Sequence, residues 1–144
     1  MVWIGIDTGT HTGVAVWDSA VREFTEITSL PIHAALEKVR NLAKFYSFKN
    51  LGVTVAFEDA RLRVWIPKER DLRQVKGRAM GAGSVKRDSA IWEAALKDWN
   101  IPYKKVAPKN NMTKLTDEAF RRITGWTKRT NEHGRDAAML VFGR

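Results

Sequence analysis

Cysteine is absent from the 144 residues, and no long run of apolar residues occurs. The lack of cysteine excludes disulfide bonds and thiolate metal sites. Crossing a membrane takes about 20 consecutive apolar residues, a length that no stretch approaches. The chain also enters a strand-like run at once, with no basic leader or signal-peptide core. We therefore expect a cytoplasmic protein with no membrane partner.

Internal repeats and low-complexity tracts are absent too. Apolar residues make up 44% of the chain and charged residues 28%, which is ordinary for a soluble globular protein. The length suits one domain with one hydrophobic core. These features predict a single domain that spans residues 1–144.

The charge is strongly positive and unevenly distributed. The net charge is +9, and segments 59–87 and 101–135 each carry nine Lys or Arg against three acidic residues. The first segment contains Trp65 and the second contains Trp126. A basic segment is often only a solvated surface. Two such segments, each with an aromatic residue able to stack on a base, favour a nucleic-acid partner.

The pattern of apolar residues predicts an α/β fold. Alternating or unbroken β-rich runs predict strands at residues 2–7, 14–18, 21–28, 51–57 and 103–107. Helical spacing predicts helices at residues 35–46, 84–99, 113–123 and 133–142. Ser84 and Thr113 are expected to open the second and third helices, and Gly125 to end the third. The basic stretch before Ser84 is expected to be a loop or a frayed helix. This order predicts a mixed five-stranded sheet with an antiparallel edge and helices on its faces.

Two carboxylates are expected at neighbouring strand ends. Asp7 ends the first strand, where the chain enters the stretch TGTHTG, and Glu58 follows the buried strand at residues 51–57. The ends of parallel neighbouring strands lie side by side at one rim of a sheet. Like charges there repel each other unless a cation joins them. Hard cations such as Mg²⁺ prefer oxygen ligands of this kind.

The last predicted helix adds two more candidates. His133 and Asp136 are three residues apart, so they share one face of its first turn. Structural alternatives exist for all four residues. Asp7 could satisfy the glycine-rich turn, Glu58 could mark the exit of the chain to solvent, and the helical pair could simply favour a helix start. The position of all four at the ends of elements favours a shared site.

Three stretches, in order, resemble the motifs of the RuvC-type Holliday junction resolvases, which have an RNase H-like fold. The stretches are IGIDTGTHTGVAVWD, VAFED and HGRDAAMLV. The resemblance runs in element order from about residue 2 to residue 142. Thr8 and Thr10 depart from it, because the family more often has Pro and Ser there. The resemblance implies an RNase H-like sheet with helices on both faces and an endonuclease activity.

The resemblance also implies roles for the candidate residues. Two Mg²⁺ ions, for which Mn²⁺ can substitute, would clamp the scissile phosphate of branched DNA. Asp7 would bridge both ions, while Glu58 and Asp136 would bind one each. His133 would complete the shell or position water, and Lys114 would lie near the phosphate unless it is an ordinary solvent-exposed lysine. The products would carry 5′-phosphate and 3′-hydroxyl ends, and no nucleotide cofactor is expected.

The basic segment 59–87 follows the second carboxylate directly, so it would lie beside the metal ions. Its candidate DNA contacts are Arg61, Arg63, Arg70, Arg73, Lys76, Arg78, Lys86 and Arg87. Trp65 could stack on or wedge between unpaired bases, or be a core or interface aromatic instead. A four-way junction has twofold symmetry, which suits a C2 homodimer. The helix at residues 84–99, with Trp92 and Trp99, is a candidate dimer surface, although most of its apolar stripe must cover the sheet.

Three other functions compete with cleavage of branched DNA. The stretch GIDTGT also resembles the phosphate-binding turn of actin-type ATPases, but these need a second domain, for which 144 residues leave no room. A nuclease of the same fold that acts on RNA or an RNA–DNA hybrid would use the same carboxylates. A non-catalytic nucleic-acid-binding module would explain the charge, although four occupied ligand positions favour catalysis.

Overall fold

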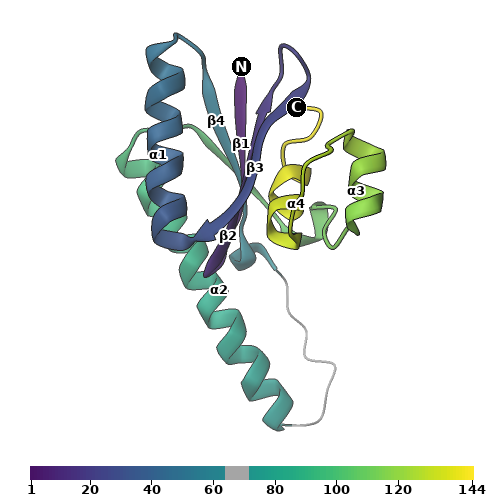
Figure 1. Cartoon of the computed structure of the whole chain (residues 1–144). Helices are drawn as coiled ribbons and strands as arrows, with labels where there is room; N and C mark the ends of the chain where they lie inside the picture. Colours follow the sequence, from purple (N-terminus) through teal and green to yellow (C-terminus); the bar gives the residue numbers. More distant parts are fainter. Residues whose placement is uncertain (64–71) are drawn as a thin grey trace.

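The computed structural model describes residues 1–63 and 72–144, without the side chains of residues 72–80, 82 and 109 (Figure 1). The strands are β1 (Val2–Asp7), β2 (His11–Asp18), β3 (Glu23–Pro31), β4 (Val53–Glu58) and β5 (Tyr103–Val106). The α-helices are α1 (Ile32–Phe48), α2 (Leu72–Asp98), α3 (Asp117–Thr124) and α4 (Glu132–Met139). Short 3-10 helices follow β4 and β5, namely η1 (Ala60–Leu62) and η2 (Pro108–Asn110).

In the described part of the chain, five strands form one mixed sheet in the order β3-β2-β1-β4-β5. β1 pairs antiparallel with β2 and parallel with β4. β2 and β3 are antiparallel, whereas β4 and β5 are parallel. The predicted mixed sheet with an antiparallel edge is confirmed, and its strand order and directions are those of the RNase H-like fold. Because β1, β4 and β5 run the same way, their C-terminal ends lie at one rim.

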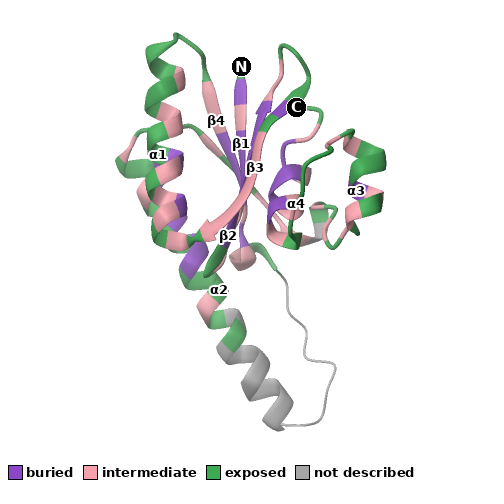
Figure 2. Cartoon of the chain, in the orientation of Figure 1, coloured by how far each residue is buried: buried purple, intermediate pink, exposed green. Residues whose placement is uncertain are grey.

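Helices cover both faces of this sheet, as predicted (Figure 1). α1 and α2 pack on one face, where Val39 and Trp92 belong to the same buried cluster as Ile4 of β1. α3 and α4 pack on the other face, where Phe120 and Val141 are buried with residues of β2 and β4. The central strands are therefore buried on both sides, as Figure 2 shows. This explains why their sequences are nearly unbroken apolar runs.

Trp92 is part of the core and not of a surface. Its side chain is wholly buried against the sheet, as is that of Leu96 in the next turn of α2. Burying a large apolar side chain stabilises a fold by about 1.5–3 kcal/mol. The expectation that Trp92 contributes to a dimer surface is wrong, because the sheet already covers it. Trp99, at the end of α2, is half-buried and has the Arg40 guanidinium 5.8 Å from its ring centroid.

α2 begins much earlier than predicted. It starts at Leu72, so Ser84 lies inside the helix and does not cap it. The stretch before Ser84, expected to be a loop or a frayed helix, contains Gly81 and Gly83, and glycine in a helix costs about 1 kcal/mol relative to alanine. The Arg, Gln, Lys, Met and Ala residues around them favour a helix and outweigh that cost. Although α2 has 27 residues, neither it nor another described helix is apolar enough to cross a membrane.

α3 begins later than predicted. Thr116, and not Thr113, caps it, because the Thr116 Oγ1 accepts a hydrogen bond from the Ala119 N–H at 3.1 Å. Two carboxylates follow in the first turn, where they interact favourably with the helix dipole. Gly125 ends α3 in the left-handed conformation with a φ of 73°, as predicted.

α4 lies directly against the backbone of β1 and β2. A Cβ atom at Gly5 would overlap the carbonyl oxygen of Ala137, and one at Gly13 would overlap the carbonyl oxygen of His133. Glycine is required at both positions because it lets two backbone segments approach closely. This contact fixes the position of the first turn of α4 over the sheet.

The substitution Gly13→Ala is expected to lower the free energy of unfolding by about 1–3 kcal/mol, because the added methyl group forces α4 away from the sheet. Gly81→Ala is the matched control, since among the described atoms a Cβ there meets nothing within 4 Å. It should stabilise α2 by about 0.5–1 kcal/mol. Urea unfolding of both variants measures the difference. A Gly13→Ala protein as stable as the natural one would contradict the close contact.

Candidate active site at the strand ends

Asp7 and Glu58 lie at the same rim of the sheet. They end β1 and β4, which are neighbouring parallel strands. The placement agrees with the expectation drawn from the two apolar runs that precede them. The Asp7 side chain is 15% exposed, so its carboxylate is largely removed from water. The rim therefore combines two acidic side chains with limited access to solvent.

Hydrogen bonds of two buried hydroxyl groups join this rim to α2. The Thr8 Oγ1 donates a hydrogen bond to the Glu58 carbonyl oxygen at 3.0 Å. The same atom lies 3.3 Å from the Ser89 Oγ, which also accepts a hydrogen bond from the Ala60 N–H at 3.3 Å. Both hydroxyl-bearing residues are buried. The sequence had shown Thr8 only as a departure from a family motif, and no local signal marks Ser89.

The first turn of α4 brings His133 beside Asp7. Asn131 caps this helix by accepting a hydrogen bond from the Gly134 N–H at 2.9 Å, while the small Ala137 is buried against the sheet. The His133 Nδ1 lies 3.0 Å from the Asp7 Oδ2. Two candidate residues from opposite ends of the chain are thus in direct contact.

A polar turn after η2 contacts the other two candidate carboxylates. The Lys114 N–H donates a hydrogen bond to the Asp136 Oδ1 at 2.9 Å. The Asn111 Nδ2 donates to the Glu58 Oε2 and to the backbone carbonyl oxygen of Asp136, each at 3.2 Å. Lys114 has a φ of 59°, which is uncommon for a residue other than glycine. Lys114 was a candidate from the sequence, whereas Asn111 was missed.

The electrostatics of the rim disfavour full ionisation of Asp7. Burial raises its pKa from 3.8 to about 7. The hydrogen bond from His133 opposes this rise, and the charges of Asp136 and Glu58 add to it. Burial also raises the pKa of Asp136, although the hydrogen bond from the Lys114 N–H lowers it. The rim is therefore an environment that a bound cation would stabilise.

The donor types at the rim suit a hard divalent cation. They are carboxylate oxygens, an imidazole, and the Oδ1 of Asn111, which is buried and has no hydrogen-bond partner. Within residues 1–63 and 72–144, however, no three His, Cys, Asp or Glu side chains are grouped so as to hold a metal ion. Their polar atoms instead contact each other, His133 with Asp7 and Asn111 with Glu58. A cation would have to replace part of these contacts.

Arg61, a predicted DNA contact, binds two carboxylates of the protein itself. Its guanidinium lies 2.7 Å from the Asp59 Oδ2 and 2.6 Å from the Glu93 Oε2. The hydrogen bond from Arg61 lowers the pKa of Glu93 to about 2. This network joins the end of β4 to α2. It also balances the charge of Arg61 within the protein, so a DNA contact by Arg61 stays a prediction.

The other candidate DNA contacts differ in how much of each residue the structure describes. Trp65 and Arg70 lie outside the described residues. For three candidates the structure gives only the backbone, in the first part of α2, namely Arg73, Lys76 and Arg78. Three more have exposed side chains, namely Arg63, Lys86 and Arg87. Trp126, suggested as a base-stacking residue, is partly buried and packs edge-on against Phe24 at the margin of the core on the α4 face, with ring centroids 6.3 Å apart.

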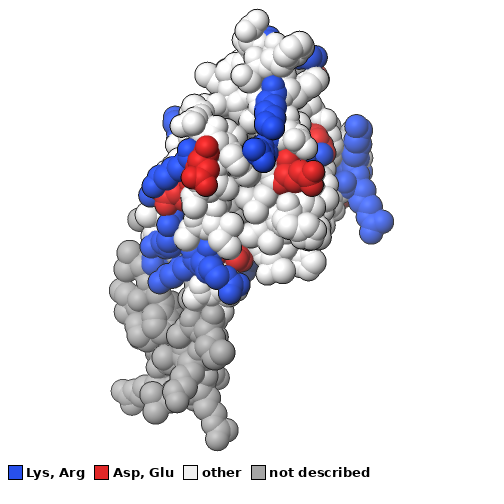
Figure 3. Space-filling model, turned by 90° about the vertical axis from the view of Figure 1, so that its left-hand side faces the viewer, with Lys and Arg blue, Asp and Glu red and all other residues white. Residues whose placement is uncertain are grey.

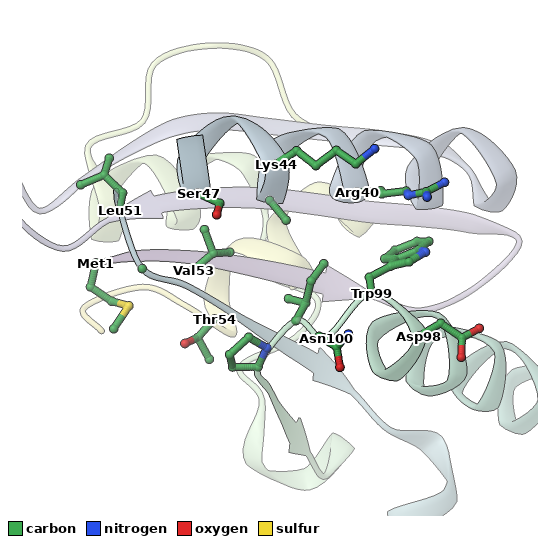
Figure 4. Close-up of a pocket in the computed structure, with 14 residues that line it drawn as sticks. Met1, Arg40, Lys44, Ser47, Leu51, Val53, Thr54, Asp98, Trp99 and Asn100 are labelled. Carbon is green, nitrogen blue, oxygen red and sulfur yellow. The ribbon is translucent and has the colours of Figure 1, made fainter. Parts of the chain in front are cut away.

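An open cavity of about 700 Å³ lies at the other end of the sheet (Figure 4). α1 contributes Arg40 and Lys44 to its wall, and the end of α2 contributes Asp98 and Trp99. Residues at the starts of β1 and β4 complete it. Because these strands carry the candidate carboxylates at their opposite ends, the cavity is separate from the candidate active site.

No protein-family model matches the chain, and no curated protein matches it. Among solved structures, the chain is similar to one titled "Thermus thermophilus RuvC structure", with 18% sequence identity and a TM-score of 0.48. The similarity covers 97% of this chain and 91% of the other. A likeness of this size carries no argument about activity, so the candidate site rests on the chain's own geometry.

Asp7→Asn is expected to make the metal-free protein more stable above pH 7 and to leave its stability unchanged near pH 4. With a pKa of about 7 in the folded protein, Asp7 keeps a proton that the unfolded chain loses near pH 4. Folding is therefore increasingly penalised as the pH rises from 4 to 7. The penalty, on the order of 1–4 kcal/mol, disappears in the variant.

Urea unfolding between pH 4 and pH 8 in a chelator measures this difference. The control is Asp98→Asn, which changes an exposed aspartate at the other end of the sheet. Parallel pH profiles for Asp7→Asn and the natural protein would show that Asp7 is not held in a disfavoured ionised state.

Proposed function

We propose that the protein is a divalent-metal-dependent nuclease that hydrolyses branched DNA, as its resemblance to RuvC-type resolvases implies. The observation that carries this proposal is the convergence of β1, β4 and α4 at one rim. These elements, far apart in the sequence, each contribute a carboxylate there, from Asp7, Glu58 and Asp136. Carboxylates that only marked the ends of strands and helices would be expected in solvent and apart from one another, because burial and like charges disfavour their ionisation.

In the proposed reaction, Asp7, Glu58 and Asp136 would hold the divalent cation, which is Mg²⁺ with Mn²⁺ as a substitute. When bound, the cation would supply an activated water and stabilise charge on the phosphate. His133 orients the Asp7 carboxylate through its Nδ1, and its imidazole is able to position water or move a proton. The exposed Lys114 side chain would neutralise charge on the scissile phosphate.

Binding of the DNA is proposed to depend on a few Lys and Arg side chains near this rim. Exposed Lys and Arg side chains supply affinity for phosphates of any sequence. On the face shown in Figure 3, Lys and Arg side chains lie among Asp and Glu side chains and do not form a uniform basic surface. Arg63 and Lys86, both exposed, are the proposed contacts with described side chains. A C2 dimer would present two such rims to a twofold-symmetric junction.

Asp7→Asn, Glu58→Gln and Asp136→Asn are each expected to slow cleavage of a synthetic four-way DNA junction by more than about 100-fold. Loss of an outer partner of a metal ligand alone costs about 10–100-fold, and these residues are the proposed ligands themselves. Binding of the junction should persist, because the variants remove negative charge next to phosphates. Cleavage in Mg²⁺, and gel-shift binding in a chelator, measure the two effects.

Glu37→Gln is the control for these variants, since it changes an exposed carboxylate on α1. Linear duplex and RNA–DNA hybrid serve as comparison substrates. Preferential cleavage of the hybrid would favour a nuclease that acts on RNA. Cleavage of every substrate at the natural rate by any one of the three variants would remove that residue from the proposed set of ligands.

Junction affinity is expected to fall steeply with salt, in the manner of counterion release. Arg63→Gln and Lys86→Gln should each reduce the log–log slope by about 0.9 if each side chain contacts one phosphate. Lys44→Gln is the matched control, because Lys44 lies in the cavity at the other end of the sheet. Fluorescence-anisotropy titrations over a range of salt concentrations measure the slopes. If the slopes of Arg63→Gln and Lys86→Gln equalled that of Lys44→Gln, neither Arg63 nor Lys86 would contact the DNA.

A further inference from the structure

The Asn111 side chain connects two of the proposed ligand-bearing elements. Its Nδ2 donates one hydrogen bond to the Glu58 carboxylate on β4 and another to the Asp136 carbonyl oxygen on α4, each at 3.2 Å. Among the described side chains, Asn111 is the one that the structure shows donating to the Glu58 carboxylate. We propose that Asn111 is a positioning residue, which orients Glu58 for cation binding. The proposal rests on the proposed function of this rim.

The orientation of the Asn111 amide is fixed by its partners. Both partners, a carboxylate oxygen and a carbonyl oxygen, only accept hydrogen bonds. If the amide turned over, its own oxygen would face both of these acceptors and be repelled by the Glu58 charge. The NH₂ group therefore has to face Glu58, and its hydrogen bond orients the Glu58 carboxylate. A ligand held in advance loses less conformational freedom when it binds a cation.

The backbone around Asn111 is also held in place. The 3-10 helix η2 begins with Pro108, and the Asn111 N–H donates to the Pro108 carbonyl oxygen at 3.3 Å. Three residues later, the Lys114 N–H donates to the Asp136 carboxylate. The left-handed φ of Lys114 is the kind of local strain that persists when surrounding contacts determine it. The turn at residues 111–114 thus contacts both carboxylates and sets their separation.

The remaining polar atom of Asn111 has no partner in the protein. Its Oδ1 is buried and accepts no hydrogen bond among the described residues. A buried acceptor without a partner is unfavourable, and such atoms call for a water or a ligand. Mg²⁺ in proteins usually keeps several of its waters. The Oδ1 therefore provides an acceptor for a water of the cation that Glu58 binds, and this contact too depends on Glu58 holding the cation there.

Mn²⁺ binding to the full chain tests this role without any measurement of cleavage. Titrations followed by electron paramagnetic resonance compare the natural protein with Asn111→Leu, Glu58→Gln and the double variant. Asn111→Leu is expected to weaken Mn²⁺ binding by about 10–100-fold, as is typical when a partner of a metal ligand is lost. The double variant should bind no more weakly than Glu58→Gln alone, because Asn111 acts through Glu58.

Asn110→Leu is the matched control, since it alters the exposed neighbour in the same turn and should leave Mn²⁺ affinity unchanged. If Asn111→Leu does not fold, as judged by circular dichroism, Asn111→Ala replaces it in the same cycle. Unchanged Mn²⁺ affinity in the Asn111 variant would overturn the positioning role, as would losses that simply add in the double variant.

The failure of this proposal is distinguishable from failure of the proposed function. If the natural protein binds no Mn²⁺, both are overturned. If it binds Mn²⁺ with the expected non-additive cycle but cleaves no substrate, the nuclease proposal fails and the role of Asn111 in cation binding stands. If it cleaves junctions and the Asn111 variant binds Mn²⁺ as tightly as the natural protein, only the role of Asn111 is overturned.

Discussion

The candidate site depends on the contact between α4 and the bare backbone of the sheet at Gly5 and Gly13. Carbonyl groups of α4 occupy the space that side chains would fill at these two positions. The helix cannot slide along the strands without colliding with the neighbouring residues, which are larger. Its first turn therefore stays beside the end of β1, where His133 reaches Asp7. Packing of the apolar layers, more than any polar contact, determines which polar groups meet.

The rim lowers the stability of the fold locally, and other contacts offset this. A buried Asp7 close to further negative charge is unfavourable in the absence of a cation. The hydrogen bonds of Thr8 and Ser89, and the binding of Arg61 by Asp59 and Glu93, join the same strand ends to α2. Proteins commonly retain unfavourable groups of this kind where they are needed for function.

Local patterns predicted much of the fold, and tertiary contacts account for most of what they missed. The bounds of β1 were predicted from an apolar run that ends at a glycine-rich turn, and the spacing of His133 and Asp136 predicted a shared helix turn. The start of α2 was missed because the helix propensity of the residues around its glycines outweighs the cost of the glycines. Asn111 was missed because its contact with Glu58 joins residues 53 positions apart, and no local pattern records such a contact.

α2 continues well beyond the strand ends (Figure 1). Ser89 contacts Thr8 at the rim, and the helix begins at Leu72, so about 25 Å of helix projects past the carboxylates at 1.5 Å per residue. That length equals about seven base-pair steps of 3.4 Å each. Any nucleic acid that touched the tip of α2 and also reached the carboxylates would have to span most of a turn of double helix. The distance between those two points of contact would be set by the length of the helix.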